Sequence, residues 1–169
     1  MLRTHTVPAA RALAFLRMVT GTWLFVAGAG KMTIYRIGGV LPLPVTALQW
    51  QVDFPTRLAV WLSQHPDGVL AAIVRDLLIP RGALVAGVVA WSQLLAGVLL
   101  VLGLRTRLAA ALSAVVALAL TVSAGWLDPN AARLYAMLGA LSIALFIGRA
   151  GDTLGLDGWR RERRRDRDL

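Results

Sequence analysis

Two uncharged runs of about twenty residues constrain this chain more than any other feature of its sequence. They cover Ala83–Leu104 and Leu108–Leu127. A helix needs about 20 apolar residues to cross the hydrocarbon core of a bilayer. Hydrophobic residues make up 57% of the chain, against roughly 45–50% in soluble domains, so a water-soluble fold of this size could not bury them all. The sequence therefore predicts an integral membrane protein.

The apolar pattern predicts an all-α fold, an integral membrane bundle of four transmembrane helices in a single membrane domain that covers residues 1–158. A tight turn that carries Arg105 and Arg107 joins the second and third helices, which must therefore be antiparallel neighbours. The expected spans are 9–30, 81–103, 107–125 and 130–149, and a basic tail follows at 159–169.

An extracytoplasmic loop, residues 31–80, separates the first two spans and is too long to be a simple connector. Its glycine- and proline-rich part, Gly38–Pro44, indicates irregular chain. The segments Pro55–Gln64 and Gly68–Leu78 are typical of short helices, the second with Asp67 as its N-cap. Apolar residues recur at helical spacing in this second segment, so we expect an amphipathic helix on the membrane surface or over the end of the bundle.

The positions of the basic residues predict the orientation of the chain. Arg3 and Arg11 precede the first span, Arg105 and Arg107 fill the second turn, and the last seven of the 18 basic residues begin at Arg149. Basic residues that flank membrane spans gather on the cytoplasmic side. We therefore expect both termini in the cytoplasm.

A net charge of +9 could suggest nucleic acid as a partner, but the positions of the charges favour lipid headgroups. The charges sit at the ends of apolar spans, and the basic tail at 159–169 follows a hydrophobic helix, which is typical of binding to anionic lipids. Basic residues and tryptophan concentrate at membrane interfaces, so Arg105, Arg107 and Trp126 are assigned to topology and to contact with lipid headgroups.

A small residue recurs every four positions in the fourth span, at Ala136, Ala140, Ala144 and Gly148. Such a stripe lets another helix approach closely. It indicates either packing within the bundle or contact with a partner, which is a second protein subunit or another copy of the chain.

The sequence offers few residues for chemistry of its own. It has no cysteine, which excludes thiolate nucleophiles and Cys-ligated iron–sulfur clusters, and it has only two histidines, His5 and His65. No known catalytic motif is present, and the spans carry no Asp or Glu in their central turns. We therefore predict no metal site and no covalently bound cofactor, and the sequence identifies no catalytic residue.

Three polar residues at membrane depth are the candidate ligand-binding residues: Arg17, Lys31 and Gln93. The two cations also have a simpler explanation, because long basic side chains near helix ends reach toward the interface. The amide of Gln93 needs a partner, since hydrocarbon offers none. Its partner is either another helix, through Ser113 or Ser142, or the carbonyl of a ligand such as a quinone.

Several short segments resemble the DoxX/DoxD family of membrane proteins. Arg17–Gly21 and Gly28–Lys31 are similar to its first helix, and Ser92–Gly97 and Leu100–Leu108 to its second helix and the turn that follows. The stretch Ala150–Asp157 is similar to the Gly-Leu-Asp ending of the DoxD branch. The likeness extends over nearly the whole chain.

The resemblance implies a four-helix subunit of the bacterial or archaeal cytoplasmic (inner) membrane. In the family, such subunits are linked to quinone-coupled oxidation of sulfur compounds such as thiosulfate, or to redox defence. A quinone is then the implied cofactor, Arg17, Lys31 and Gln93 line its site, and a partner protein supplies electrons. The family usually has Glu at the position of Gln93, so this chain lacks a titratable group there.

Two functional hypotheses follow from the residues and the resemblance. The first is a membrane subunit of a quinone-dependent oxidoreductase. The alternative is a non-enzymatic anchor or scaffold that holds the other subunits of a complex at the membrane. A transporter of small solutes or lipids is a weaker third hypothesis, because nothing in the sequence indicates inverted repeats or broken helices.

Overall fold

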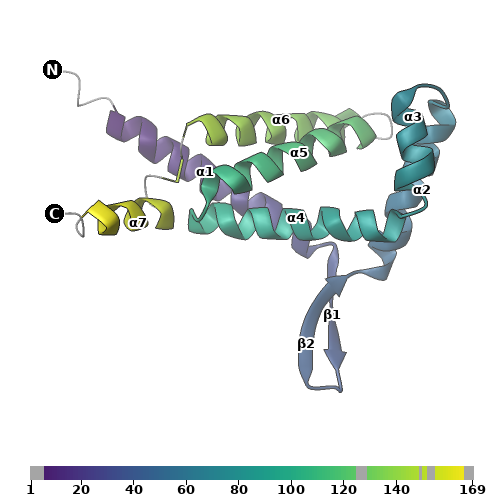
Figure 1. Cartoon of the computed structure of the whole chain (residues 1–169), viewed down its shortest axis with the longest axis horizontal. Coiled ribbons are helices and arrows are strands. Elements are labelled where there is room, and N and C mark those ends of the chain that lie inside the picture. The colour runs from purple at the N-terminus through teal and green to yellow at the C-terminus, as the bar shows by residue number, and fades with distance from the viewer. Residues whose placement is uncertain (1–5, 125–128, 149, 152–154, 166–169) are drawn as a thin grey trace.

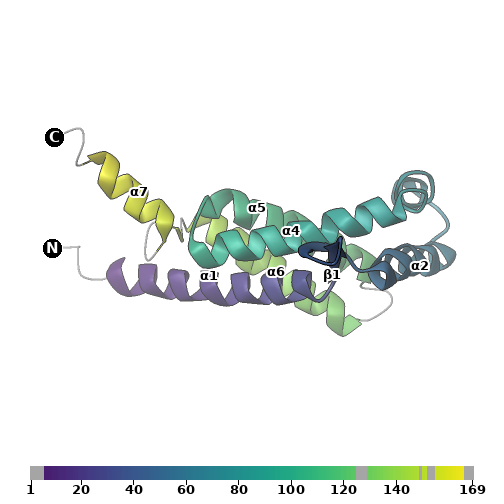
Figure 2. The same cartoon turned by 90° about the horizontal axis from the view of Figure 1, so that it is seen from below.

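The computed structural model of the protein describes residues 6–124, 129–148, 150–151 and 155–165. Four long helices form the bundle: α1 (Thr6–Ala29), α4 (Gly82–Leu102), α5 (Thr106–Ala124) and α6 (Pro129–Ile147). A helix of 10 residues, α7 (Leu156–Arg165), lies at the same end of the molecule as the start of α1 (Figures 1 and 2). The opposite end is covered by the segment between α1 and α4.

Three helices in the described part of the chain are long and apolar enough to cross a membrane. They are Ala9–Ala29, Gly82–Leu102 and Asn130–Ile147. The apolar stretch of α5, Thr106–Thr121, is shorter than these three. The chain is thus a mostly helical protein with membrane-spanning segments.

A β-hairpin interrupts the helical fold, so the all-α prediction was wrong in this segment. Strand β1 (Met32–Ile37) pairs antiparallel with β2 (Leu41–Thr46), and Ile37 stands opposite Leu41. Gly38 and Gly39, which had indicated irregular chain, form the turn with positive φ angles of 60° and 77°. The hairpin projects sideways from the bundle (Figure 1). The two glycines thus permit the tight turn between the strands and do not mark irregular chain.

The helices of the loop differ from their predicted limits. Helix α2 (Leu48–Gln64) begins seven residues before Pro55, which lies inside it and packs against Gly82 of α4. The short α3 (Val69–Ile73) continues as a π-helix over Val74–Leu78. Asp67 does not cap it: the N-cap residue is Gly68, and no side chain bonds to the free N–H groups there.

Helices α1 and α4 pack with their backbones almost in contact. Three glycines make this possible: a Cβ on Gly21 would lie 2.8 Å from the backbone nitrogen of Val101, one on Gly28 2.6 Å from that of Leu94, and one on Gly97 would collide with that of Phe25. Small residues at such crossings are typical of membrane helices. These pairs also fix an antiparallel register.

The buried side chains form two clusters, one toward each end of the bundle. The first joins α1, α4, α5 and α6 around Leu100 and Leu145. The second joins α2 to α4 and α5 around Phe54 and Trp61. Between them, Ser113 of α5 and Ser142 of α6 share a buried hydrogen bond of 2.7 Å.

The glycine contact between α1 and α4 gives a direct test of this packing. Gly97→Ala should lower the free energy of unfolding by about 1–3 kcal/mol relative to Gly87→Ala, because its methyl group meets the backbone of α1. Gly87 lies on the same helix, and a Cβ there meets only Oγ1 of Thr46, at 3.5 Å. Thermal unfolding in detergent measures both variants, and equal stabilities would contradict the close approach.

Candidate functional site

Gln93 is a buried polar residue in a helix that crosses the membrane. It lies on the stripe of α4 that also buries Ala86, Ala90, Gly97 and Leu100, and its side chain is 3% exposed. The amide oxygen Oε1 accepts no hydrogen bond from the residues that the structure describes. In hydrocarbon an unsatisfied polar group costs several kcal/mol. Gln93 therefore carries an acceptor that a bound molecule can satisfy.

The helix partners expected for Gln93 are occupied by each other. Ser113 and Ser142 form their own hydrogen bond, and the hydroxyl of Ser142 also donates to the carbonyl of Leu138 at 2.8 Å. The two serines thus join α5 to α6 and do not bind Gln93. The contacts between polar side chains of neighbouring helices depend on how each helix is rotated about its axis. The spacing of apolar residues alone does not determine this rotation.

Lys31 lies just beyond the end of α1, close to the level of Gln93. Its ammonium donates to the carbonyl of Ala27 at 2.8 Å and stands 5.0 Å from the centre of the Trp50 ring. Gly28, one turn earlier, packs on Leu94, the neighbour of Gln93. Burial lowers the pKa of Lys31, and the positive charge of Arg57 lowers this pKa further.

Arg17 occupies the opposite end of the bundle. Its side chain is fully buried, and Nη1 donates to the carbonyl of Ala150 at 2.8 Å. Gly103, whose missing side chain leaves room for this guanidinium, follows Gln93 by ten residues, or about 15 Å along a helix. Arg17 is thus held inside the protein and does not reach toward the interface. The structure brings Lys31 near the level of Gln93, but it does not bring Arg17 into the same site.

Asp157, to which no sequence pattern assigned a role, lies at the same end of the bundle as Arg17. The Asp157 carboxylate accepts the backbone N–H groups of Arg105 and Thr106, both at 2.9 Å, and so caps the start of α5 from another helix. Its own N–H donates to the carbonyl of Gly103 at 3.0 Å. Asp157 also attracts Arg17 electrostatically. The signals in the sequence were an acidic residue among glycines after the last long helix and the resemblance of this stretch to the Gly-Leu-Asp ending.

The residues assigned to topology lie on the surface or outside the described chain. Arg105 and Arg107 are exposed at the start of α5, and the guanidinium of Arg107 stands 4.9 Å from the centre of the Phe146 ring. Arg105 has a positive φ of 46° in the turn. Trp126 lies outside the described residues. Over the described ranges, no three His, Cys, Asp or Glu residues gather where they could hold a metal ion.

The capping role of Asp157 leads to a prediction about stability. Asp157→Ala leaves two backbone N–H groups without their charged acceptor and should lower the free energy of unfolding by about 2 kcal/mol. The exposed Asp67, which caps no helix, is the matched control, and Asp67→Ala should change little. Thermal unfolding of the two variants beside the parent measures the difference. A loss no larger for Asp157→Ala than for Asp67→Ala would contradict the capping role.

Comparison with known proteins gives one match. The family model of DoxX matches residues 12–126, well over half of the chain. No curated protein and no solved structure matches. The matched range contains Arg17, Lys31 and Gln93, and it ends before the DoxD-like segment that includes Asp157.

Proposed function

The chain belongs to the DoxX family of membrane proteins, and from this premise we propose that it is a quinone-associated membrane subunit. The observation that carries the proposal is the buried amide of Gln93, whose Oε1 has no hydrogen-bond partner among the described residues. An amide suits both forms of the ligand: its NH₂ group donates to a quinone carbonyl, and its oxygen accepts from a quinol hydroxyl. Lys31 adds a positive charge on the same side of the bundle.

A partner protein supplies the electrons in this proposal. A quinone takes up two electrons and two protons to become a quinol, and the chain has no cysteine to ligate an iron–sulfur cluster or to form a redox-active disulfide. Oxidation of a sulfur compound such as thiosulfate is the reaction class that the resemblance of Ala150–Asp157 to the DoxD ending supports. Arg17 is not part of this site, because it binds the segment after α6 at the other end of the bundle.

The proposed setting is the cytoplasmic membrane of a bacterium or archaeon. In this setting α5 is the fourth membrane span, since it packs along α6 and lies between two helices that are long enough to cross. The start of α1 and α7 share one end of the molecule (Figure 2), where Arg105 and Arg107 also lie. The positive-inside rule places this end in the cytoplasm.

A specific observation favours the anchor role as the second candidate. In the small-residue stripe of α6, the side chains of Ala136, Ala140 and Ala144 are exposed and not covered by the bundle. A helix of another subunit can approach closely there. Purified protein that contains no quinone but retains a stoichiometric partner subunit would favour the anchor.

The quinone proposal is tested by the quinone content of purified variants. Gln93→Leu removes both the donor and the acceptor and should lower quinone occupancy about five-fold, the equivalent of one hydrogen bond of about 1 kcal/mol. The matched control is Ser113→Ala, another buried polar position, whose partner is within the bundle. It should cost about 0.6 kcal/mol of stability and leave quinone occupancy unchanged.

Extraction of the lipids, followed by chromatography, gives the ratio of quinone to protein in each sample. The proposal is wrong if the parent carries no quinone, or if Gln93→Leu retains as much quinone as Ser113→Ala.

The orientation has a separate test. Because the chain has no cysteine, a single introduced cysteine is the only thiol that a reagent can label. Cysteines at Gln64, exposed at the end of α2, and at Asp168, in the basic tail, are treated with a membrane-impermeant thiol reagent in intact cells. We expect reaction at position 64 only, and reaction at 168 only after permeabilisation. Labelling of position 168 in intact cells would reverse the assigned orientation.

A further inference from the structure

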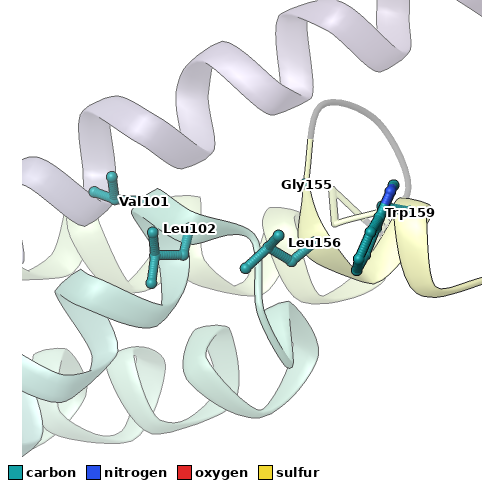
Figure 3. Close-up of a pocket in the computed structure, with 5 residues that line it drawn as sticks. All are labelled: Val101, Leu102, Gly155, Leu156 and Trp159. Carbon is teal, nitrogen blue, oxygen red and sulfur yellow. The ribbon is translucent and has the colours of Figure 1, made fainter.

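An apolar hollow lies between the end of α4 and the start of α7. It has a volume of about 560 Å³ and is lined by Val101, Leu102, Gly155, Leu156 and Trp159 (Figure 3). Gly155 lines it with its backbone, and Leu156 and Trp159 form the wall on the side of α7. Because this lining is mostly hydrocarbon, the hollow suits an apolar chain.

A second hollow continues the first along the contact between α1 and α4. It has a volume of about 280 Å³ and shares Val101 and Leu102 with the first, while Thr22, Phe25 and Val98 complete its lining. The two hollows meet at Val101 and Leu102 and are together called here the α4–α7 groove, which extends from α7 along the membrane-spanning part of α4. Its direction matches that of an acyl chain in a bilayer.

The α7 end of the groove is strongly basic. Residues 160–165 include five arginines and one glutamate. The guanidinium of Arg163 lies 3.9 Å from the centre of the Trp159 ring, which places a positive charge beside the lining of the groove. The carboxylate of Asp157, in the first turn of α7, is engaged by the backbone N–H groups of Arg105 and Thr106.

We propose that the α4–α7 groove is a binding site for one anionic phospholipid. An acyl chain lies along Val98, Val101 and Leu102, and the phosphate stands at α7, where Arg163 binds it. An arginine at an anionic membrane surface contributes about five-fold in affinity, and its planar guanidinium suits a phosphate. The site is independent of the proposed quinone function, because Gln93 does not line the groove.

The headgroup contact is tested with the full-length protein in detergent. Phosphatidylglycerol and phosphatidylcholine of equal chain length are supplied in equal amounts, and native mass spectrometry counts the lipids that each variant retains. The parent should retain phosphatidylglycerol in preference. Arg163→Ala should lower this preference about five-fold, and Arg133→Ala, an exposed arginine at the start of α6, should not change it.

The chain contact is tested by filling the groove. Leu102→Trp places a large ring in both hollows and should reduce retained phosphatidylglycerol to the background level. Leu84→Trp is the matched control, since Leu84 is exposed on the same helix and lines neither hollow. The proposal is overturned if the parent retains the two lipids equally, or if Leu102→Trp retains as much phosphatidylglycerol as Leu84→Trp.

Discussion

The direct contact between the backbones of α1 and α4 determines which polar groups of these two helices lie at the same level. Gly21, Gly28 and Gly97 allow no side chain between the two helices, so they cannot slide past each other without a collision. This antiparallel register places Arg17 beside the α4–α5 turn and the end of α1 beside Gln93. In a membrane, where water offers no partners, the register thereby decides which polar groups are satisfied within the protein.

At the Arg17 end, polar groups bind one another. The guanidinium of Arg17, which is fully buried, binds Ala150, and the half-buried Asp157 binds the start of α5, so each of the two opposite charges makes hydrogen bonds. A buried ion is tolerated only with such partners. Gly103 and Gly155 are needed here for a simple steric reason, because a Cβ on either would lie less than 3 Å from Arg17. At this end of the bundle, these polar contacts connect α1 and α5 to the chain that follows α6.

The membrane character and the helices of the bundle could be predicted from apolar length, because hydrocarbon allows few alternatives to a helix. The position of α4, Gly82–Leu102, follows from an uncharged run with a glycine and an arginine just beyond it. The hairpin could not be distinguished from irregular chain, since Gly38 and Gly39 suit both. Asp157 was missed because it caps a helix that begins 51 residues earlier, and no local pattern reports such a contact.

Arg17 and Gln93 differ in whether the protein itself satisfies their polar groups. Both are polar residues at membrane depth, and sequence placed them in one site. Arg17 has its hydrogen-bond acceptor at the end of α6, whereas Oε1 of Gln93 has no donor in any segment that the structure describes. An amide buried without a donor for its oxygen costs stability that an apolar side chain at position 93 would not cost. In the proposed quinone site, the hydroxyl of a quinol supplies that donor.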